Sequence, residues 1–140
     1  MTKQNKYTVF VSYTSSDSWI AKQIELHIKS CGANTFLFDL DSDVGENIDN
    51  KIIEQIKKSK ELFVLFTPAS LDKRYIWSEI GAAWGNGIII IAVLYGIELN
   101  NFITDKNNPN FLKSNNIINL NDVDKYFNQL KRRVKKRISK

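Results

Sequence analysis

The sequence has very little cysteine, little proline and no long apolar run. Its 140 residues include one cysteine, Cys31, and two prolines. A single thiol excludes an internal disulfide and a cysteine-rich zinc site, and we expect a reducing, cytoplasmic environment. The longest apolar run, residues 88–95, is too short to cross a bilayer, and the first ten residues lack the apolar stretch of a secretory signal. We therefore expect a soluble protein with no membrane partner.

The composition that remains is that of one globular domain. Hydrophobic residues make up 43% and charged residues 25% of the chain, which excludes the low-hydrophobicity class of disordered proteins. A chain of this length buries roughly two thirds of its unfolded surface. Because the sequence shows neither an internal repeat nor a linker, we predict a single domain over residues 1–140, with its core from about residue 7 to residue 137.

Positive charge is concentrated in one segment. The net charge is +5, and residues 131–140, KRRVKKRISK, hold seven of the 20 Lys and Arg and no acid. Such a run can attract nucleic acid or anionic lipid. However, Val134 and Ile138 are four positions apart, as on the buried side of a helix, and cations suit the negative end of a helix dipole. We therefore interpret the run as a solvated helix end and expect no nucleic-acid partner.

Strand-like and helix-like segments alternate along the chain. Short apolar runs predict strands at residues 7–13, 35–38, 62–66, 88–94 and 117–120. Apolar residues three and four apart predict helices after residue 18 and over residues 48–56, 75–84 and 122–137. We place Trp19, Ile24 and Ile28 on the buried side of the first helix, which Gly32 closes. The alternation predicts an α/β fold, an open sheet of about five parallel strands with helices on both faces.

Ligands of such sheets bind at the carboxyl ends of the strands, near the point where the strand order reverses. This rule nominates the loops at residues 12–18, 38–47, 67–75 and 94–101, with the helix that starts near Tyr75 at the rim.

Four segments resemble the TIR (Toll/interleukin-1 receptor) family, in the family's order and spacing. They are VFVSYTSSD at 9–17, FDLDSDVGENI at 38–48, LFVLFTPASL at 62–71 and YIWSEIGAAWG at 75–85. The resemblance extends over residues 7–137 and implies a flavodoxin-like sheet. Many bacterial and some eukaryotic members of the family cleave the nicotinamide–ribose bond of NAD, so the resemblance also implies this activity. Other members only assemble.

The resemblance assigns the essential glutamate of the catalytic members to Glu79. The family usually has Trp four positions before this glutamate, whereas this chain has Tyr75, with Trp77 two residues later. Tyr75, Trp77 and Phe38 are therefore all candidates for stacking on a base. The alternative for Glu79 is a solvated helix carboxylate that pairs with a neighbouring cation.

Breaking the nicotinamide–ribose bond creates an oxocarbenium-like sugar, which a fixed negative charge stabilises. One carboxylate suffices because nicotinamide leaves from an already cationic ring. We expect Glu79 to hold the ribose hydroxyls, and the backbone amides of residues 12–18 to hold the diphosphate. The predicted substrate-binding residues are Ser12, Tyr13, Phe38, Asp39, Tyr75 and Trp77. NAD is the substrate here, and we expect no cofactor.

Other candidate sites have less support. The acids Asp39, Asp41 and Asp43 alternate as in a calcium loop, but the glycine and glutamate of an EF-hand are not at their positions, so we expect no metal. We interpret His27 as a surface residue and Cys31 as a small core residue.

We predict an NAD glycohydrolase or ADP-ribosyl cyclase that acts in bacterial anti-phage immunity. The first alternative is a non-catalytic adaptor that works through TIR–TIR assembly. The second is a nucleoside deoxyribosyltransferase, because SEIGAAWG at 78–85 also resembles the glutamate helix of those enzymes. The expected protein partners are further copies of the domain and a separate sensor or effector.

Overall fold

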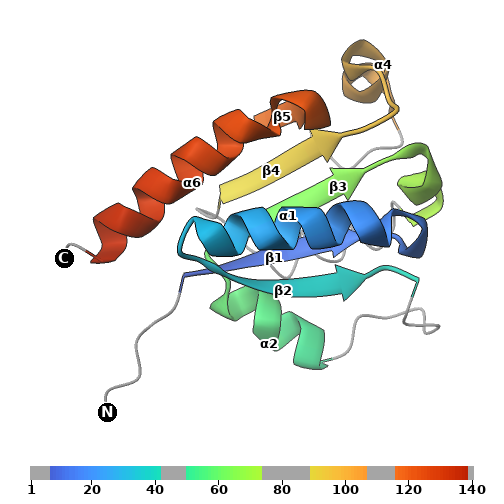
Figure 1. The fold of residues 1–140 in the computed structure, drawn as a ribbon. Helices are drawn as coiled ribbons and strands as arrows, with labels where there is room; N and C mark the ends of the chain where they lie inside the picture. Colours follow the sequence, from blue (N-terminus) through green and yellow to red (C-terminus); the bar gives the residue numbers. More distant parts are fainter. Residues whose placement is uncertain (1–6, 42–49, 74–88, 107–115, 139–140) are drawn as a thin grey trace.

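The structure, a computed structural model, describes residues 7–41, 50–73, 89–106 and 116–138 (Figure 1). Its strands are β1 (Thr8–Tyr13), β2 (Asn34–Asp39), β3 (Glu61–Phe66), β4 (Ile89–Leu94) and β5 (Asn116–Asn119). Its helices are α1 (Ser18–Ser30), α2 (Asn50–Lys58), α4 (Leu99–Thr104) and α6 (Val123–Ile138), with short 3-10 helices η1 (Ser15–Asp17), η2 (Pro68–Lys73) and η3 (Leu120–Asp122). All five predicted strands are confirmed, and the helix predicted over residues 75–84 lies outside the described residues.

The five strands form one parallel sheet in the order β2-β1-β3-β4-β5, which confirms the predicted open sheet. The chain first moves from β1 outward to β2, and then crosses to the other side of β1 to form β3. The strand order therefore reverses between β1 and β3, so the loops that follow these two strands flank the switch point of the sheet (Figure 1).

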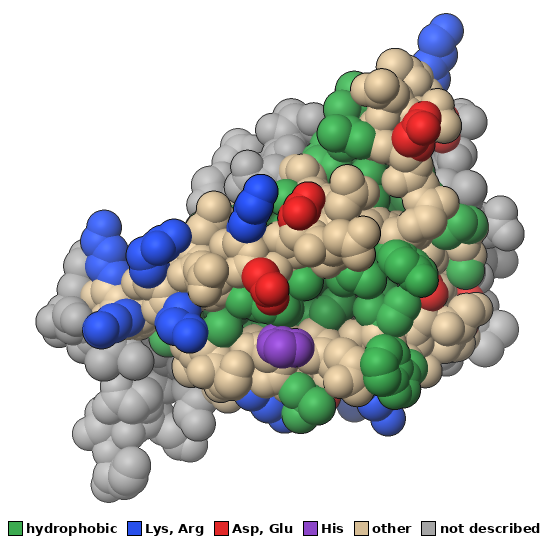
Figure 2. All heavy atoms as spheres, turned by 45° about the horizontal axis from the view of Figure 1, so that its top comes forward, with side chains coloured by type: hydrophobic (Ala, Val, Ile, Leu, Met, Phe, Trp, Pro, Cys, Tyr) green, Lys and Arg blue, Asp and Glu red, His purple; other side chains and the backbone are tan. Residues whose placement is uncertain are grey.

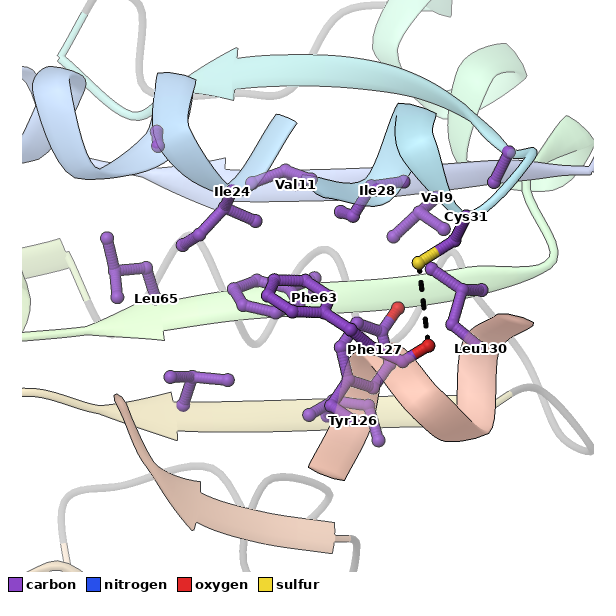
Figure 3. Packing of buried hydrophobic residues seen from close by; sticks show 14 of the residues in the cluster. Val9, Val11, Ile24, Ile28, Cys31, Phe63, Leu65, Tyr126, Phe127 and Leu130 are labelled. Carbon is purple, nitrogen blue, oxygen red and sulfur yellow. Dashed lines mark hydrogen bonds between the residues drawn. The ribbon is translucent and has the colours of Figure 1, made fainter. Parts of the chain in front are cut away.

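Helices cover both faces of the sheet, because the strands bury side chains on both sides. On one face, Val11 and Phe63 pack with Ile28 of α1 and Leu130 of α6 (Figure 3). On the other face, a second cluster joins the strands to α2 and α4; it includes Phe10, Leu62, Phe66, Ile56 and Phe102. No helix in the described part of the chain is both long and apolar enough to cross a membrane.

Helix α1 buries a narrower side than the sequence predicted. Ile24 and Ile28 are buried as expected, but Trp19 is 71% exposed, so its placement on the buried side was wrong. At about 100° per residue, Trp19 lies roughly 140° around the helix from Ile24. Gly32 ends the helix as predicted, with a φ of 95° that favours glycine.

Helix α6 packs against α1 and the sheet through four buried side chains, those of Tyr126, Phe127, Leu130 and Val134, and the burial of Val134 confirms its expected side. The buried thiol of Cys31 donates a hydrogen bond to the carbonyl oxygen of Phe127 at 3.4 Å (Figure 3). The exposed His27 ring stacks on the Phe127 ring at 5.0 Å between centroids. Both residues therefore have the structural positions that the sequence predicted.

A buried charge holds α6 to the start of β3. The carboxylate of Glu61, which is fully buried, accepts hydrogen bonds from Arg133 Nε at 2.6 Å and Arg133 Nη2 at 3.0 Å. The hydroxyls of Tyr126, at 2.7 Å, and Tyr7 donate to the same carboxylate. A cation and two hydroxyls thus satisfy the buried charge, which would otherwise be strongly destabilising.

Candidate functional site

The loops that follow β1 and β3 are joined by one carboxylate at the switch point of the sheet. Asp17, at the end of η1, accepts hydrogen bonds from Thr14 Oγ1 at 2.8 Å and from Thr67 Oγ1 at 2.6 Å. Both threonines are almost completely buried, whereas Asp17 is half-buried. Asp17 therefore connects two segments 50 residues apart in sequence, at the edge where ligands of open parallel sheets bind.

Asp17 occupies a position at which an acid commonly caps a helix. It is the residue before α1, but its side chain makes no capping hydrogen bond. Both threonine hydroxyls instead donate to the same oxygen of Asp17, Oδ2. This contact was missed because Thr67 has no local sequence signal beyond its place after a buried strand and before Pro68.

Ser70 fixes the loop that carries Thr67. The Ser70 hydroxyl, which is fully buried, accepts a hydrogen bond from the Thr67 amide at 2.8 Å and donates one to the Thr67 carbonyl oxygen at 2.8 Å. The first turn after β3 is therefore held rigidly. Helix η2 continues from this turn to Lys73.

The loop after β1 also contacts the end of β2. The Ser15 hydroxyl donates to Asp39 Oδ2 at 2.7 Å, and the Ser15 amide donates to Asp41 Oδ2 at 2.9 Å. The Asp41 amide in turn donates to Asp39 Oδ1 at 2.9 Å. The Ser15 amide, one of those predicted to bind the diphosphate, is therefore hydrogen-bonded to the Asp41 carboxylate in this structure.

The predicted substrate-binding residues of β1 and β2 lie at different depths. Ser12 is fully buried within β1, and Phe38 is 5% exposed and packs near Phe10, with 5.8 Å between ring centroids. Tyr13 is also buried, and this burial, followed by the nearby Asp39 and Glu25 carboxylates, raises the pKa of its hydroxyl. Asp39 is half-buried at the surface of the edge. Ser12 and Phe38 are thus buried beneath the surface of this edge, whereas Asp39 is partly exposed at that surface.

Tyr75, Trp77 and Glu79 lie outside the described residues, and their roles stay predictions. Among the residues that the structure does describe, no group of three or more His, Cys, Asp and Glu side chains has the arrangement of a metal site. The described part of the edge is therefore a network of hydroxyls and carboxylates that can donate to and accept from a polar ligand.

Comparison with known sequences identifies the family. The pattern of the TIR domain family matches residues 9–134. The chain belongs to the TIR domain family. The matched range includes β1, the switch-point loops and residues 75–79, so the resemblance found in the sequence is confirmed at the level of the family. A comparison with curated proteins found no match.

Solved structures with a similar fold include other TIR domains. The RPS4 and RRS1 TIR domain heterodimer matches with a TM-score of 0.64 and 15% identity, over 94% of this chain and 97% of that one. A metazoan TIR-STING receptor from C. gigas matches with a TM-score of 0.61 and 20% identity, over 96% of this chain but only 42% of the receptor. At these identities the likeness shows the fold alone.

A flavodoxin-like sheet is confirmed by a second group of structures. A diflavin flavoprotein A3 from Nostoc sp. matches with a TM-score of 0.57 and 14% identity, over 90% of this chain and 87% of that one. The flavodoxin-type strand order places the switch point between β1 and β3. In this TIR domain, that point is where Asp17 joins the two loops.

Proposed function

We propose that this TIR domain cleaves the nicotinamide–ribose bond of NAD, as an NAD glycohydrolase or ADP-ribosyl cyclase. The observation that carries the proposal is Glu79, which stands four positions after Tyr75 within the matched family range. A carboxylate near the ribose would stabilise the positive charge that develops as nicotinamide leaves. The biological setting that we propose is cytoplasmic bacterial defence against phage, by depletion of NAD or by production of a cyclic nucleotide signal.

Asp39 is suited to bind a ribose of this substrate. It is the last residue of β2, the strand beside β1, and one of its oxygens already accepts a hydroxyl hydrogen bond, from Ser15. Sheets that bind dinucleotides commonly use an acid at this place to bind ribose hydroxyls. Asp39 would therefore accept a hydrogen bond from a ribose hydroxyl as it now accepts one from the Ser15 hydroxyl.

The Ser15 amide can bind the diphosphate only after it loses its hydrogen bond to Asp41. Asp41 now accepts its hydrogen bond at 2.9 Å, so a phosphate oxygen would have to replace the Asp41 carboxylate. Three carboxylates, those of Asp17, Asp39 and Asp41, lie near this turn and would repel a diphosphate. We therefore expect Asp41→Asn to lower the KM for NAD several-fold, with kcat little changed.

Incubation of the purified chain with NAD, followed by mass spectrometry of the products, tests the proposal. We expect free nicotinamide with ADP-ribose or its cyclic form, and a loss of roughly 100-fold or more in kcat for Glu79→Gln. Glu54→Gln is a matched control, because Glu54 is an exposed helix glutamate of α2 away from the carboxyl edge. The control should keep the wild-type rate.

The proposal is wrong if no nicotinamide is released at protein concentrations that permit assembly, or if Glu79→Gln and Glu54→Gln behave alike. A parallel incubation with a deoxynucleoside and a free base tests the deoxyribosyltransferase alternative. Base exchange without NAD cleavage would favour that enzyme class.

A second candidate function is assembly without catalysis. Trp19 and Leu26 are 71% and 61% exposed, and they are seven positions apart on α1, so they lie on one side of the helix. Exposed apolar pairs of this kind favour contact with another protein. Among the similar structures, one is named as a TIR heterodimer and another as the TIR domains of the activated Roq1 resistosome.

Light scattering of wild type and the double variant Trp19→Gln/Leu26→Gln tests this second function. We expect the variant to remain folded and to lose self-association. Lys22→Gln/Lys29→Gln on the same helix is the control, because it keeps both apolar side chains. Assembly that persists in the apolar variant would exclude this side of α1 as the contact.

A further inference from the structure

The fold gathers cations at the amino edge of the sheet, the end opposite to the candidate site. Helices α1, α2 and α6 run back toward the starts of the strands, so their last turns all lie at this edge (Figure 1). Six exposed cations belong to what we name the amino-edge basic surface: Lys57, Lys58, Lys60, Lys131, Arg132 and Lys136. Figure 2 shows the Lys and Arg side chains that gather around the end of α6.

The contact between Glu61 and Arg133 places the end of α6 beside the start of β3. The distance between Arg133 Nε and Glu61 Oε2 is 2.6 Å. Arg132 precedes Arg133 in the chain and Lys60 precedes Glu61, so these two cations belong to the same end of the molecule. Cations from α2, from the start of β3 and from α6 are thereby brought to one end of the molecule. From the sequence, the basic run at residues 131–140 was interpreted as a solvated helix end with no nucleic-acid partner. The fold brings Lys57, Lys58 and Lys60 to the same end of the molecule, and this larger surface is the reason to revise that expectation.

The six cations have no carboxylate partner within the described residues. Two ion pairs of the described residues, Arg133 with Glu61 and Lys29 with Glu25, lie near this end, and neither includes a member of the amino-edge basic surface. Glu61 is fully buried and Glu25 also accepts a hydrogen bond from Thr35, so both acids are already engaged. The charge of the surface is therefore directed outward, to solvent and to any external anion.

The exposed apolar side chains argue against a lipid surface as that anion. Peripheral membrane attachment combines basic charge with apolar side chains that enter the lipid. Five large apolar side chains are exposed among the described residues, and four of them, Trp19, Tyr95, Leu99 and Ile103, lie at or near the carboxyl edge. The amino-edge basic surface thus offers charge with little apolar anchorage.

Two acids of the carboxyl edge, Asp17 and Asp39, are also poor partners for it in a second copy of the chain. Asp17 is bound by two threonine hydroxyls and Asp39 by the Ser15 hydroxyl and the Asp41 amide, so each acid is already used within its own chain. A nucleic acid instead presents a continuous row of phosphates, each with a full charge.

We infer that the amino-edge basic surface binds the phosphate backbone of a nucleic acid, without base specificity, and leaves the carboxyl edge free. The large aromatic side chains that are exposed among the described residues, Trp19 and Tyr95, lie at or near the opposite edge, so the surface binds phosphates and offers no aromatic ring to stack on bases. This inference does not depend on the proposed function.

Fluorescence anisotropy of the full chain with a labelled 30-base-pair DNA duplex of arbitrary sequence tests the inference. With about five phosphates bound, we expect log K to fall with log salt at a slope of roughly −4, a loss of on the order of 10²-fold between 50 and 200 mM salt. A second duplex of unrelated sequence should bind equally well. Absence of binding at 50 mM salt would overturn the inference outright.

Three charge variants locate the surface, each with the same change in net charge. Lys57→Gln/Lys58→Gln/Lys60→Gln and Lys131→Gln/Arg132→Gln/Lys136→Gln should each weaken binding at least tenfold at 100 mM salt and reduce the slope by about 2. The matched control is Lys22→Gln/Lys51→Gln/Lys125→Gln, which removes exposed lysines from the N-terminal halves of α1, α2 and α6. It should change the affinity less than threefold.

Three results would contradict the inference. Wild-type affinity in the α2 variant would mean that the α6 run binds alone, and an equal loss in the control would mean that only net charge matters. Binding to phosphatidylserine vesicles without binding to the duplex would identify a lipid partner instead. Circular dichroism of all three variants separates these outcomes from a loss of folding.

Discussion

The two edges of the sheet stabilise carboxylates in different ways. At the amino edge, Glu61 is fully buried and is bound by the Arg133 guanidinium and two tyrosine hydroxyls. At the carboxyl edge, Asp17 is half-buried and is bound by two threonine hydroxyls, which are neutral donors. The first arrangement is a closed ion pair within the core, whereas the second keeps a net negative charge beside the switch point.

This difference gives the two carboxylates different roles: Glu61 stabilises the fold, whereas Asp17 remains able to contact a ligand. A buried charge with a cation partner fixes α6 on the sheet, but its atoms are not accessible to a ligand. A half-buried charge with neutral partners costs less to rearrange and can exchange a hydroxyl of the chain for a hydroxyl of a ligand. We therefore expect substitutions in the Glu61 cluster to change stability, and substitutions around Asp17 to change the binding of a ligand at the carboxyl edge.

The largest stability effect should come from Arg133→Met. The variant leaves the Glu61 carboxylate buried without its cation, so we expect a loss of about 3 kcal/mol in the free energy of unfolding, measured with urea. Arg132→Met, an exposed neighbour on the same helix, should stay within about 0.5 kcal/mol of wild type. Equal values for the two variants would mean that the ion pair does not hold α6.

Tyr126→Phe should cost less, about 2 kcal/mol, because it removes one hydrogen bond to a charged group and leaves the guanidinium in place. Tyr95→Phe is the control, since Tyr95 is 51% exposed. A cost within 0.5 kcal/mol for Tyr126→Phe would show that Arg133 and Tyr7 satisfy Glu61 without the Tyr126 hydroxyl.

Alkaline pH should weaken the same cluster. Burial, followed by the nearby Glu61 carboxylate, raises the pKa of Tyr126 well above its ordinary value of 10.0. Because the folded state holds this proton more tightly than the unfolded state, the stabilisation is complete below about pH 10 and declines as the pH rises further. Urea unfolding from pH 9 to 11 should show a smaller decline for Tyr126→Phe than for wild type, and parallel curves would contradict this.

Thr67→Val, at the carboxyl edge, should have a smaller effect on stability, about 1 kcal/mol. It preserves the shape of a buried side chain and removes one of the two donors to Asp17. Thr67→Val should also raise the KM for NAD, because the loop after β3 loses its hydrogen bond to the loop after β1. Thr104→Val, in the exposed α4, is the control for both measurements.

The smallest effect should be that of Trp19→Ala, within about 0.5 kcal/mol of wild type. The side chain is 71% exposed, so its removal should leave no cavity in the core. A loss of 2 kcal/mol or more would restore the sequence-based placement of Trp19 on the buried side of α1.

Local sequence patterns predicted the elements of this fold well. The apolar runs of all five strands and the three-and-four spacing in α6 depend on neighbouring residues only, and the structure confirms them. Trp19 was misplaced because apolar character alone does not fix the side of a helix. The cysteine and histidine of α1 were interpreted correctly because their neighbours indicated core and surface.

The contacts that define the two edges could not be read from local patterns. Asp17 meets Thr67 across 50 positions, and Glu61 meets Arg133 across 72. In the sequence, Glu61 is one charge in a polar stretch before a strand, and Asp17 is one of several possible helix caps. Which donor reaches each acid depends on the strand order and on the packing of α6, so the structure was needed for both.

The most direct test of the account is the rate of nicotinamide release from NAD by Glu79→Gln, measured beside its urea unfolding curve. We predict a rate at least about 100-fold below wild type, with an unchanged free energy of unfolding. A folded Glu79→Gln variant that releases nicotinamide at the wild-type rate would contradict the assignment of catalysis to Glu79.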